Sequence, residues 1–373
     1  MKILFRILKW TLIGILSFVL ILTVFNILPF TISSANGENH FRKTDKYPLV
    51  IPHGGAKELA PENTIWAYDM LINDFNADVL EIDLALTKDN ILIAHHDLDL
   101  EMSDGFHMDG ELIRNYTYQE ILDGYETDDY YLARQFKYPE DYDYDPVKGI
   151  EPFKNETDEN IMSKMVPAKL EDIFSNVGAD VLYILEIKDS PTSQGFDGNV
   201  HDFELAAQAL IDLVETYELE TRVVLASFSD DVTGYFKDNA PDILVNAGTS
   251  EVTMFAVYSA FYIDFFWGVK SEVLILPTPG SMSITGSTAS LLDMLPSFIR
   301  NSIAIKDDQG VYRANLMGKE IINDAHRKNM AVLYWTINDE ETMRLLIANG
   351  ADGIITDRPD ILIDVINDLK GIS

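Results

Sequence analysis

Histidine and acidic residues recur in this sequence where short apolar runs occur or end, a pattern that can support acid–base and metal chemistry. His53 ends the run PLVIPH and opens the loop HGGAKELAPENT. The next run, ADVLEIDLAL, carries Glu81 and Asp83 two positions apart, so both carboxylates project from one face of a strand. Burial raises the pKa of such carboxylates unless a cation keeps them ionised. The spacing therefore predicts a bound cation beside Glu81 and Asp83.

A later run, VLYILEIK, repeats this spacing with Glu186 and Lys188. Three carboxylates suit a hard divalent ion, Ca²⁺ or Mg²⁺, as a cofactor, and a lysine beside them suits an anionic substrate. The alternative without chemistry is an ion pair between Glu186 and Lys188, with Glu81 and Asp83 facing solvent.

The turn sequence TKDN separates the Glu81 run from an apolar return, ILIAHHD. If the chain reverses around Asp89, residues whose numbers sum to about 178 face each other, which places His95 or His96 opposite Asp83. A second histidine then comes within reach of the carboxylates and of His53. Two histidines flanking a cation supply a base and an acid for cleaving a phosphodiester, while the cation and the lysine stabilise developing negative charge.

The elements that must position these residues are short apolar strands alternating with helical stretches. Eight such strands are expected, in the runs PLVIPH, ADVLEIDLAL, VLYILEIK, RVVLASF, DILVNA, EVLILP, MAVLYWTI and ADGIIT. This alternation predicts an α/β fold with a parallel sheet, and eight units favour a closed barrel over an open sheet. Active sites of such folds lie at the carboxyl ends of the strands, where His53 is expected. Pro61 is expected to start the helix that follows, with Glu62 in its first turn.

Two stretches depart from the alternation. Residues 125–145 are rich in tyrosine and carboxylates, and we expect a subdomain over residues 123–165, inserted in a barrel loop. Residues 254–268, MFAVYSAFYIDFFWG, are aromatic and too short for a membrane span. They fit either a buried barrel helix or a lid that touches lipid.

Composition excludes several classes of protein. The 373 residues include no cysteine, which excludes disulfides, a thiolate nucleophile and cysteine-bound metal. The formal net charge of −33 argues against nucleic acid as a partner, because nucleic acid binding depends on lysine and arginine.

The N-terminal residues read as a membrane anchor. Residues 10–32 form a long run without charge, preceded by a basic segment, residues 1–9, that should stay in the cytoplasm. A cleaved signal peptide is the alternative, since small residues follow at 33–35. We expect a single-pass protein of the cell membrane, with residues 33–46 as a polar linker and residues 47–373 as an extracytoplasmic barrel. If the segment is cleaved, the barrel is secreted.

From residue 47 onward the chain resembles the glycerophosphodiester phosphodiesterases, with their motifs in that family's order. The motifs are HGG, PENT, ADVLEIDLALTKDN, AHHD, VPAKLEDIF, LEIK, SF, LYWTIND and GADGIITDRP. The resemblance implies a TIM (β/α)₈ barrel that hydrolyses glycerophosphodiesters to sn-glycerol 3-phosphate and an alcohol. It implies the following roles: His53 and His96 as the acid and base pair, Glu81, Asp83 and Glu186 as metal ligands, Lys188 as a phosphate ligand, and Trp335 against the glycerol moiety.

One residue departs from the family pattern, which usually has His-Arg-Gly at the first histidine. Here Gly54 follows His53, and glycine cannot make the bidentate phosphate contact of arginine. Lys57 and Arg358 are the candidates to replace it. Two other functions stay open at this point: a phosphodiesterase acting on lysophospholipids or phosphoinositides, and a barrel that binds glycerophosphodiesters without cleaving them.

Overall fold

The structure is a computed structural model of the chain. It describes residues 2–27, 31–35, 37–43, 45–100, 107–127, 160, 163–192, 201–278, 283–284, 286–294, 297, 300–301 and 304–372. Most of the expected inserted subdomain, residues 123–165, lies outside these ranges.

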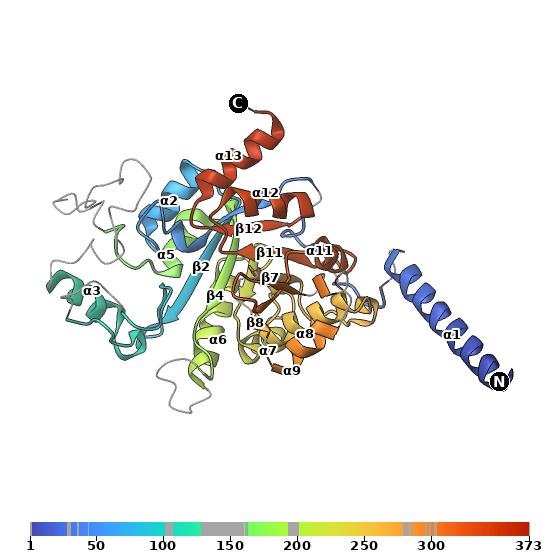
Figure 1. Ribbon diagram of the computed structural model, residues 1–373. Coiled ribbons are helices and arrows are strands. Elements are labelled where there is room, and N and C mark those ends of the chain that lie inside the picture. Colours follow the sequence, from blue (N-terminus) through green and yellow to red (C-terminus); the bar gives the residue numbers. More distant parts are fainter. Residues whose placement is uncertain are drawn as a thin grey trace.

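All eight predicted strands are present and form a closed barrel (Figure 1). They are β1 (Leu49–Pro52), β2 (Val79–Leu86), β4 (Leu182–Ile187), β5 (Val223–Ala226), β6 (Leu244–Val245), β7 (Val273–Pro277), β11 (Ala331–Trp335) and β12 (Gly353–Thr356). Parallel ladders join β2, β4, β5 and β6 in one row, and β7, β11, β12 and β1 in a second. A parallel bridge between Asn246 and Val273 joins β6 to β7, and β1 lies against β2. The predicted barrel is confirmed.

The predicted chain reversal around Asp89 is also confirmed. Strand β3 (Leu92–Ala94) runs antiparallel to β2 and pairs Leu84 with Ala94, and Leu86 with Leu92. The backbone N–H of His95 donates to the carbonyl oxygen of Asp83 at 3.0 Å. This hairpin brings His95 and His96 back toward β2.

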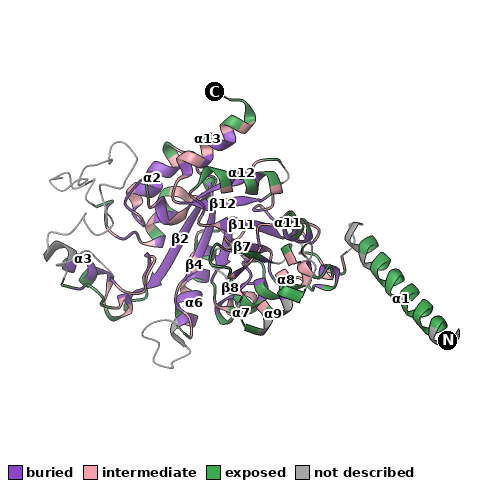
Figure 2. Cartoon of the chain, viewed as in Figure 1, coloured by how far each residue is buried: buried purple, intermediate pink, exposed green. Residues whose placement is uncertain are grey.

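Helices cover the outside of the barrel. They are α2 (Ile65–Asn73), α5 (Leu170–Val177), α6 (His201–Thr216), α7 (Asp230–Asn239), α8 (Thr249–Ala260), α11 (Lys319–His326), α12 (Glu340–Asn349) and α13 (Pro359–Lys370). Their apolar faces form two buried clusters with the strands, one around β2, β4 and β5 and one around β7, β11 and β12. Figure 2 accordingly shows buried strands beneath helices whose outer faces are exposed.

Several shorter elements extend this frame. They are α3 (Tyr118–Thr127), α9 (Gly286–Met294), and the single turns η1 (His53–Gly55), η2 (Ile113–Asn115), η4 (Gly178–Asp180) and η5 (Asp264–Phe266). A small antiparallel sheet of β8 (Ser283–Ile284), β9 (Ala304–Lys306) and β10 (Tyr312–Ala314) lies between β7 and α11 in the chain. We did not predict this sheet, because strands of two or three residues carry too few positions for a periodic pattern.

The stretch expected to be a polar linker packs against the amino-terminal end of the barrel. Phe41 is fully buried in the barrel interior, in one cluster with Leu49 of β1 and Val79 of β2. The Asn39 amide donates to the carbonyl of Glu272 at 3.0 Å, and the Ala35 N–H donates to that of Lys328 at 2.8 Å. We call the described part of residues 31–43 the docked segment. It is not the free polar linker that we predicted, because the buried Phe41 side chain and hydrogen bonds from Asn39 and Ala35 hold it against the barrel.

Helix α1 (Lys2–Ile27) precedes the docked segment and extends away from the barrel (Figure 1). Large apolar side chains along it, such as Phe5, Trp10 and Phe18, are exposed. Among the helices in the described residues, none combines the length and the apolar character needed to cross a membrane. The span predicted for residues 10–32 is therefore unsupported: the helix begins at Lys2 and includes the charged residues expected to precede the span.

The aromatic stretch of residues 254–268 forms the second half of α8 and the turn η5. Phe255 and Phe265 are buried under the barrel helices, whereas Phe261 and Phe266 are exposed. Because the segment leads from α8 into β7, its exposed turn lies at the amino ends of the strands. The expectation of a barrel helix is confirmed for residues 254–260, which belong to α8.

Candidate active site

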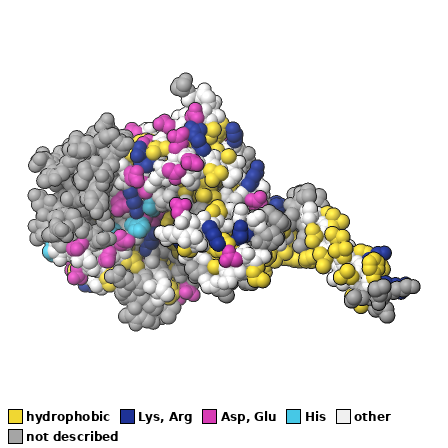
Figure 3. All heavy atoms as spheres, in the orientation of Figure 1, with side chains coloured by type: hydrophobic (Ala, Val, Ile, Leu, Met, Phe, Trp, Pro, Cys, Tyr) yellow, Lys and Arg dark blue, Asp and Glu magenta, His cyan; other side chains and the backbone are white. Residues whose placement is uncertain are grey.

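The carboxyl ends of the barrel strands bring the predicted histidines, carboxylates and lysine together. His53 directly follows β1, Glu81 and Asp83 lie within β2, and Glu186 ends β4 with Lys188 after it. Ligand atoms of Glu81, Asp83 and Glu186 all lie within 4.8 Å of one another, as do those of His53, Asp83 and His96. Asp83 belongs to both groups and is the centre of the site. Figure 3 shows histidine side chains on this face beside acidic and basic ones.

The carboxylates of Glu81 and Asp83 are buried, as predicted from their spacing. Burial raises the pKa of Glu81 to about 8, and the neighbouring charge of Asp83 adds to this effect. Burial also opposes ionisation of Asp83, but the positive charges of Lys188 and His96 outweigh it and hold the pKa of Asp83 below its ordinary value. One buried carboxyl thus keeps its proton near neutral pH while its neighbour stays charged.

Lys188 lies between two of the acidic residues. Its Nζ is 2.8 Å from Asp83 Oδ1 and 3.1 Å from Glu186 Oε1. Burial alone would lower the pKa of Lys188, but the charges of Asp83 and Glu186 raise it, so the side chain stays protonated. The predicted ion pair between Glu186 and Lys188 is present, and it is part of the carboxylate cluster rather than an alternative to it.

The chemistry of these donors fits a divalent ion. Both oxygens of Asp83 are buried. Oδ1 has Lys188 Nζ at 2.8 Å, whereas Oδ2 has no hydrogen-bond donor among the described residues. A buried carboxylate oxygen without a donor is costly unless a cation compensates it. Three clustered carboxylates supply the oxygen ligands that hard divalent ions take. Glu81, Asp83 and Glu186 could therefore hold a metal ion, with Gly54 N–H donating to Glu81 Oε2 at 2.9 Å.

His53 is held by two residues to which we had assigned no role. Its Nδ1 lies 2.8 Å from Asp357 Oδ1, just beyond β12, and Asn338 Nδ2 donates to Asp357 Oδ2 at 2.8 Å. Burial alone would lower the pKa of His53, but the hydrogen bond to Asp357 and the charge of Glu81 raise it. Asn338 belongs to the motif LYWTIND and Asp357 to the motif GADGIITDRP. The position of Asp357, an acidic residue directly after the last strand, was the signal in the sequence that could have indicated its role.

The two adjacent histidines of the hairpin have different surroundings. His95 is buried, its Nδ1 lies 2.7 Å from the carbonyl oxygen of Asp97, and burial lowers its pKa. His96 is partly exposed, with Nδ1 2.9 Å from Asp97 Oδ1. The rings of His53 and His96 are perpendicular, with centroids 6.1 Å apart. Of the two, His96 is the one whose ring contacts His53, whereas His95 is buried in the hairpin.

Trp335 ends β11 on the same side of the barrel. Its ring packs against Phe228, with centroids 5.1 Å apart, and its indole nitrogen is buried with no partner among the described residues. These two rings form an apolar wall that begins at the carboxyl ends of β5 and β11.

Of the two candidates to replace the missing arginine, Arg358 is already engaged. Its guanidinium donates to both oxygens of Asp360, at 3.0 Å from Nε and 2.7 Å from the terminal nitrogen. Lys57 has its Nζ 3.0 Å from Glu62 Oε2 and lies on the loop that follows His53. The guanidinium of Arg358 thus binds the carboxylate of Asp360 through two nitrogens, whereas the ammonium of Lys57 forms one ion pair, with Glu62.

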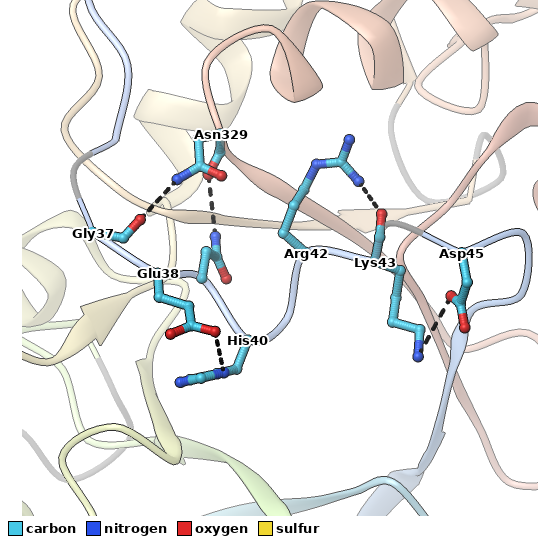
Figure 4. Close-up of a pocket in the computed structure, with 8 residues that line it drawn as sticks. Gly37, Glu38, His40, Arg42, Lys43, Asp45 and Asn329 are labelled. Carbon is cyan, nitrogen blue, oxygen red and sulfur yellow. Dashed lines mark hydrogen bonds and ion pairs between the residues drawn. The ribbon is translucent and has the colours of Figure 1, made fainter.

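A separate pocket of about 490 Å³ opens at the amino-terminal end of the barrel, between the docked segment and Asn329 (Figure 4). Its basic side chains pair with acidic ones: His40 with Glu38, Lys43 with Asp45, and Arg42 with Asp352. The pocket lies at the opposite end of the strands from His53 and His96.

Known proteins similar to this chain share one description. The chain matches the glycerophosphoryl diester phosphodiesterase family over residues 53–361. A glycerophosphodiester phosphodiesterase of Caldanaerobacter subterraneus is 24% identical over 324 residues, covering 85% of this chain and 97% of that protein. One from Bacillus altitudinis is 21% identical over 325 residues, covering 86% and 99%.

Solved structures support the fold. A glycerophosphoryl diester phosphodiesterase of Silicibacter pomeroyi superposes with a TM-score of 0.58 at 18% identity, covering 88% of this chain and 96% of that one. An Oleispira antarctica phosphodiesterase, solved with the product sn-glycerol-3-phosphate, gives 0.51 at 17% identity, covering 86% and 97%. Since the family match covers most of the barrel and contains every residue of the histidine and carboxylate site, this chain belongs to the glycerophosphoryl diester phosphodiesterase family.

Proposed function

We propose that the protein is a metal-dependent hydrolase that cleaves glycerophosphodiesters to sn-glycerol 3-phosphate and an alcohol. The observation that carries this proposal is the pair of facing histidines, 6.1 Å apart, beside a cluster of three carboxylates and a lysine. The histidines supply two groups able to transfer protons, and the lysine supplies a positive charge for an anionic substrate.

His53 and His96 serve as the acid and base pair. One removes a proton from the attacking hydroxyl, either the glycerol 2-hydroxyl or water, and the other donates a proton to the oxygen of the leaving alcohol. The hydrogen bond to Asp357 occupies Nδ1 of His53, which leaves Nε2 for proton transfer. His96 is held in the same way by Asp97. If water attacks, each histidine ends in the protonation state of the other, and proton exchange with solvent restores both. If the 2-hydroxyl attacks, a cyclic phosphate forms first, and its hydrolysis by water yields sn-glycerol 3-phosphate, reverses the two proton transfers and restores both histidines.

Glu81, Asp83 and Glu186 hold the divalent ion, Ca²⁺ or Mg²⁺. When bound, the ion polarises the phosphoryl group and offsets its growing negative charge. Lys188 contributes a fixed positive charge to the phosphate from the end of β4, and its two carboxylate contacts keep it in place. Trp335 packs against the glycerol moiety, a role supported by its half-buried ring beside Phe228 at the carboxyl end of β11.

We further propose that α1 attaches the protein to the cell membrane, with the barrel outside the cytoplasm. The support is the basic N-terminus followed by exposed apolar side chains such as Trp10, Leu16 and Phe18. Membrane fractionation of the full chain and of a chain lacking residues 1–30 tests this: we expect only the full chain in the membrane fraction. Equal amounts in solution would contradict it, and removal of the segment in mature protein would indicate a signal peptide.

The first experiment on activity measures release of sn-glycerol 3-phosphate from glycerophosphocholine with Ca²⁺, Mg²⁺ or chelator. We expect release that needs the ion and that is abolished in His53→Ala and Glu81→Ala. Activity only on lysophospholipids, rising with acyl-chain length, would instead indicate a lipid phosphodiesterase. Tight binding of glycerophosphocholine without product would indicate a binding protein.

A further inference from the structure

Gly54 leaves room that the side chain of Lys57 occupies. A Cβ added to Gly54 would lie 2.9 Å from Lys57 Cε and 3.8 Å from Lys57 Nζ. Gly54 also has a φ of +53°, in the left-handed region that favours glycine. Any larger residue at position 54 would therefore displace the end of the lysine side chain. The position of the Lys57 side chain therefore depends on the absence of a side chain at Gly54.

Lys57 lies close to the carboxylate site. The end of its side chain packs against Gly54, which follows His53 and donates its N–H to Glu81 Oε2 at 2.9 Å. Burial alone would lower the pKa of Lys57, but the negative charges of Glu62, Asp83 and Glu81 raise it. The ammonium group therefore carries its charge beside the site. Its 3.0 Å contact with Glu62 is an ion pair, and an ammonium group has three N–H donors that a further acceptor can use.

Lys57 and Lys188 follow the two strands that lie next to β2 in the barrel. Lys57 comes from the loop after β1, Lys188 follows β4, and β2 with Glu81 and Asp83 lies between these two strands. Lys188 is fixed by two carboxylates that belong to the metal-binding group, whereas the partner of Lys57, Glu62, lies outside that group. The two lysines thus differ in their partners, and of the two only Lys188 is paired with the proposed metal ligands.

We propose that Lys57 is a substrate-binding residue that contacts the phosphate oxygens opposite Lys188, and that Glu62 positions it. This inference rests on the proposed function and deepens it by naming the second cation of the phosphate site. Glu62 suits the positioning role because its Oε2 is buried and has no aligned hydrogen bond with another described residue. Gly54 then has a positive role: it keeps the path of Lys57 open.

The test compares Lys57→Met, which keeps the apolar stem over Gly54, with Lys57→Arg, which keeps the charge. Calorimetry measures the Kd of sn-glycerol 3-phosphate for the Ca²⁺-loaded full chain, and glycerophosphocholine turnover gives KM and kcat. We expect Lys57→Met to raise Kd and KM about tenfold or more and Lys57→Arg to restore most of the loss, because a charged hydrogen bond is removed and then replaced. Lys306→Met, at an exposed lysine of β9, is the control and should match the wild type.

The two proposals fail in different ways. Wild-type turnover with Kd and KM in Lys57→Met within twofold of the wild type would overturn the role of Lys57 and leave the proposed function intact. Product binding that weakens in Lys57→Met, without turnover of any glycerophosphodiester by the wild type, would support Lys57 and overturn the proposed function. Loss of Ca²⁺ binding or of the folded state in Lys57→Met, with Lys57→Arg unable to restore product binding, would show a structural role and overturn the inference.

Discussion

Replacing Asp357 by asparagine should stop His53 from transferring protons while keeping the size and shape of the side chain that contacts it. The amide of Asn338 has a fixed orientation: its oxygen accepts from Thr356 Oγ1 at 3.1 Å and from the backbone N–H of Asp357 at 2.9 Å. Its Nδ2 therefore points to the side chain of Asp357, as does Nδ1 of His53, and that side chain must accept on both sides. Aspartate can do this, but asparagine has one acceptor and one donor.

The consequence falls on the proton of His53. If the side-chain oxygen of the introduced asparagine stays toward Asn338, its NH₂ group faces Nδ1, and the histidine must carry its proton on Nε2, the nitrogen needed for proton transfer. Proton transfer by a positioned side chain contributes about 10²–10⁴-fold in rate, so we expect kcat to fall by about this range while KM changes little. Loss of the carboxylate also removes the hydrogen bond that raises the pKa of His53, so that pKa must fall.

The assay is the pH dependence of kcat/KM for glycerophosphocholine in the wild type and in Asp357→Asn. The limb governed by His53 should move to lower pH: the acidic limb if His53 is the base, the alkaline limb if it is the acid. Asp368→Asn, at an exposed residue of α13, is the control. A kcat within about threefold of the wild type, with both limbs unmoved, would refute the reasoning.

Four further predictions concern the pKa of Glu81 (two of them), the docked segment and the apolar wall. Because the pKa of Glu81 is raised to about 8, metal binding at pH 7 must release a proton, and affinity for Ca²⁺ should rise with pH up to about that value; calorimetry in two buffers without proton release would contradict this. By the same linkage the metal-free protein should lose stability as the pH rises from about 4.5 to 8, since the folded state holds that proton more tightly than the unfolded state, and thermal unfolding across this range measures it. Phe41→Ala should lower the free energy of unfolding by about 3–5 kcal/mol in urea titrations, because it empties a fully buried position, and a change below about 1 kcal/mol would show that the segment adds little. Trp335→Ala should raise KM for glycerophosphocholine several-fold with Ca²⁺ affinity unchanged, and an unaltered KM would remove Trp335 from the substrate site.

The barrel and the acidic centre were predictable because their signals are local. The alternation of polar and apolar residues in ADVLEIDLAL fixes the face of Glu81 and Asp83, and a turn sequence places His95 and His96 beside them. Each depends on residues within about one strand and one turn, over which side-chain periodicity holds.

The partners of these residues were not predictable, because they come from distant parts of the chain. Asp357 lies 304 positions from His53, and no spacing rule spans that distance. The role of Glu62 was obscured by an error in the helix boundary: α2 begins at Ile65, capped by Thr64, rather than at Pro61. Glu62 is therefore a loop residue, free to reach Lys57, and not part of a helical first turn.

The docked segment determines which end of the barrel lies next to the attachment point of α1. It fixes the chain leaving α1 to Phe265 and Lys328, at the amino ends of the strands, while the histidines lie at the other end. Whatever holds α1 therefore holds the molecule by its base. If the N-terminus is coupled to a bead, the face that carries His53 and His96 is turned toward the bulk solution. An enzyme immobilised in this way should therefore accept bulky polymeric diesters as readily as the free enzyme.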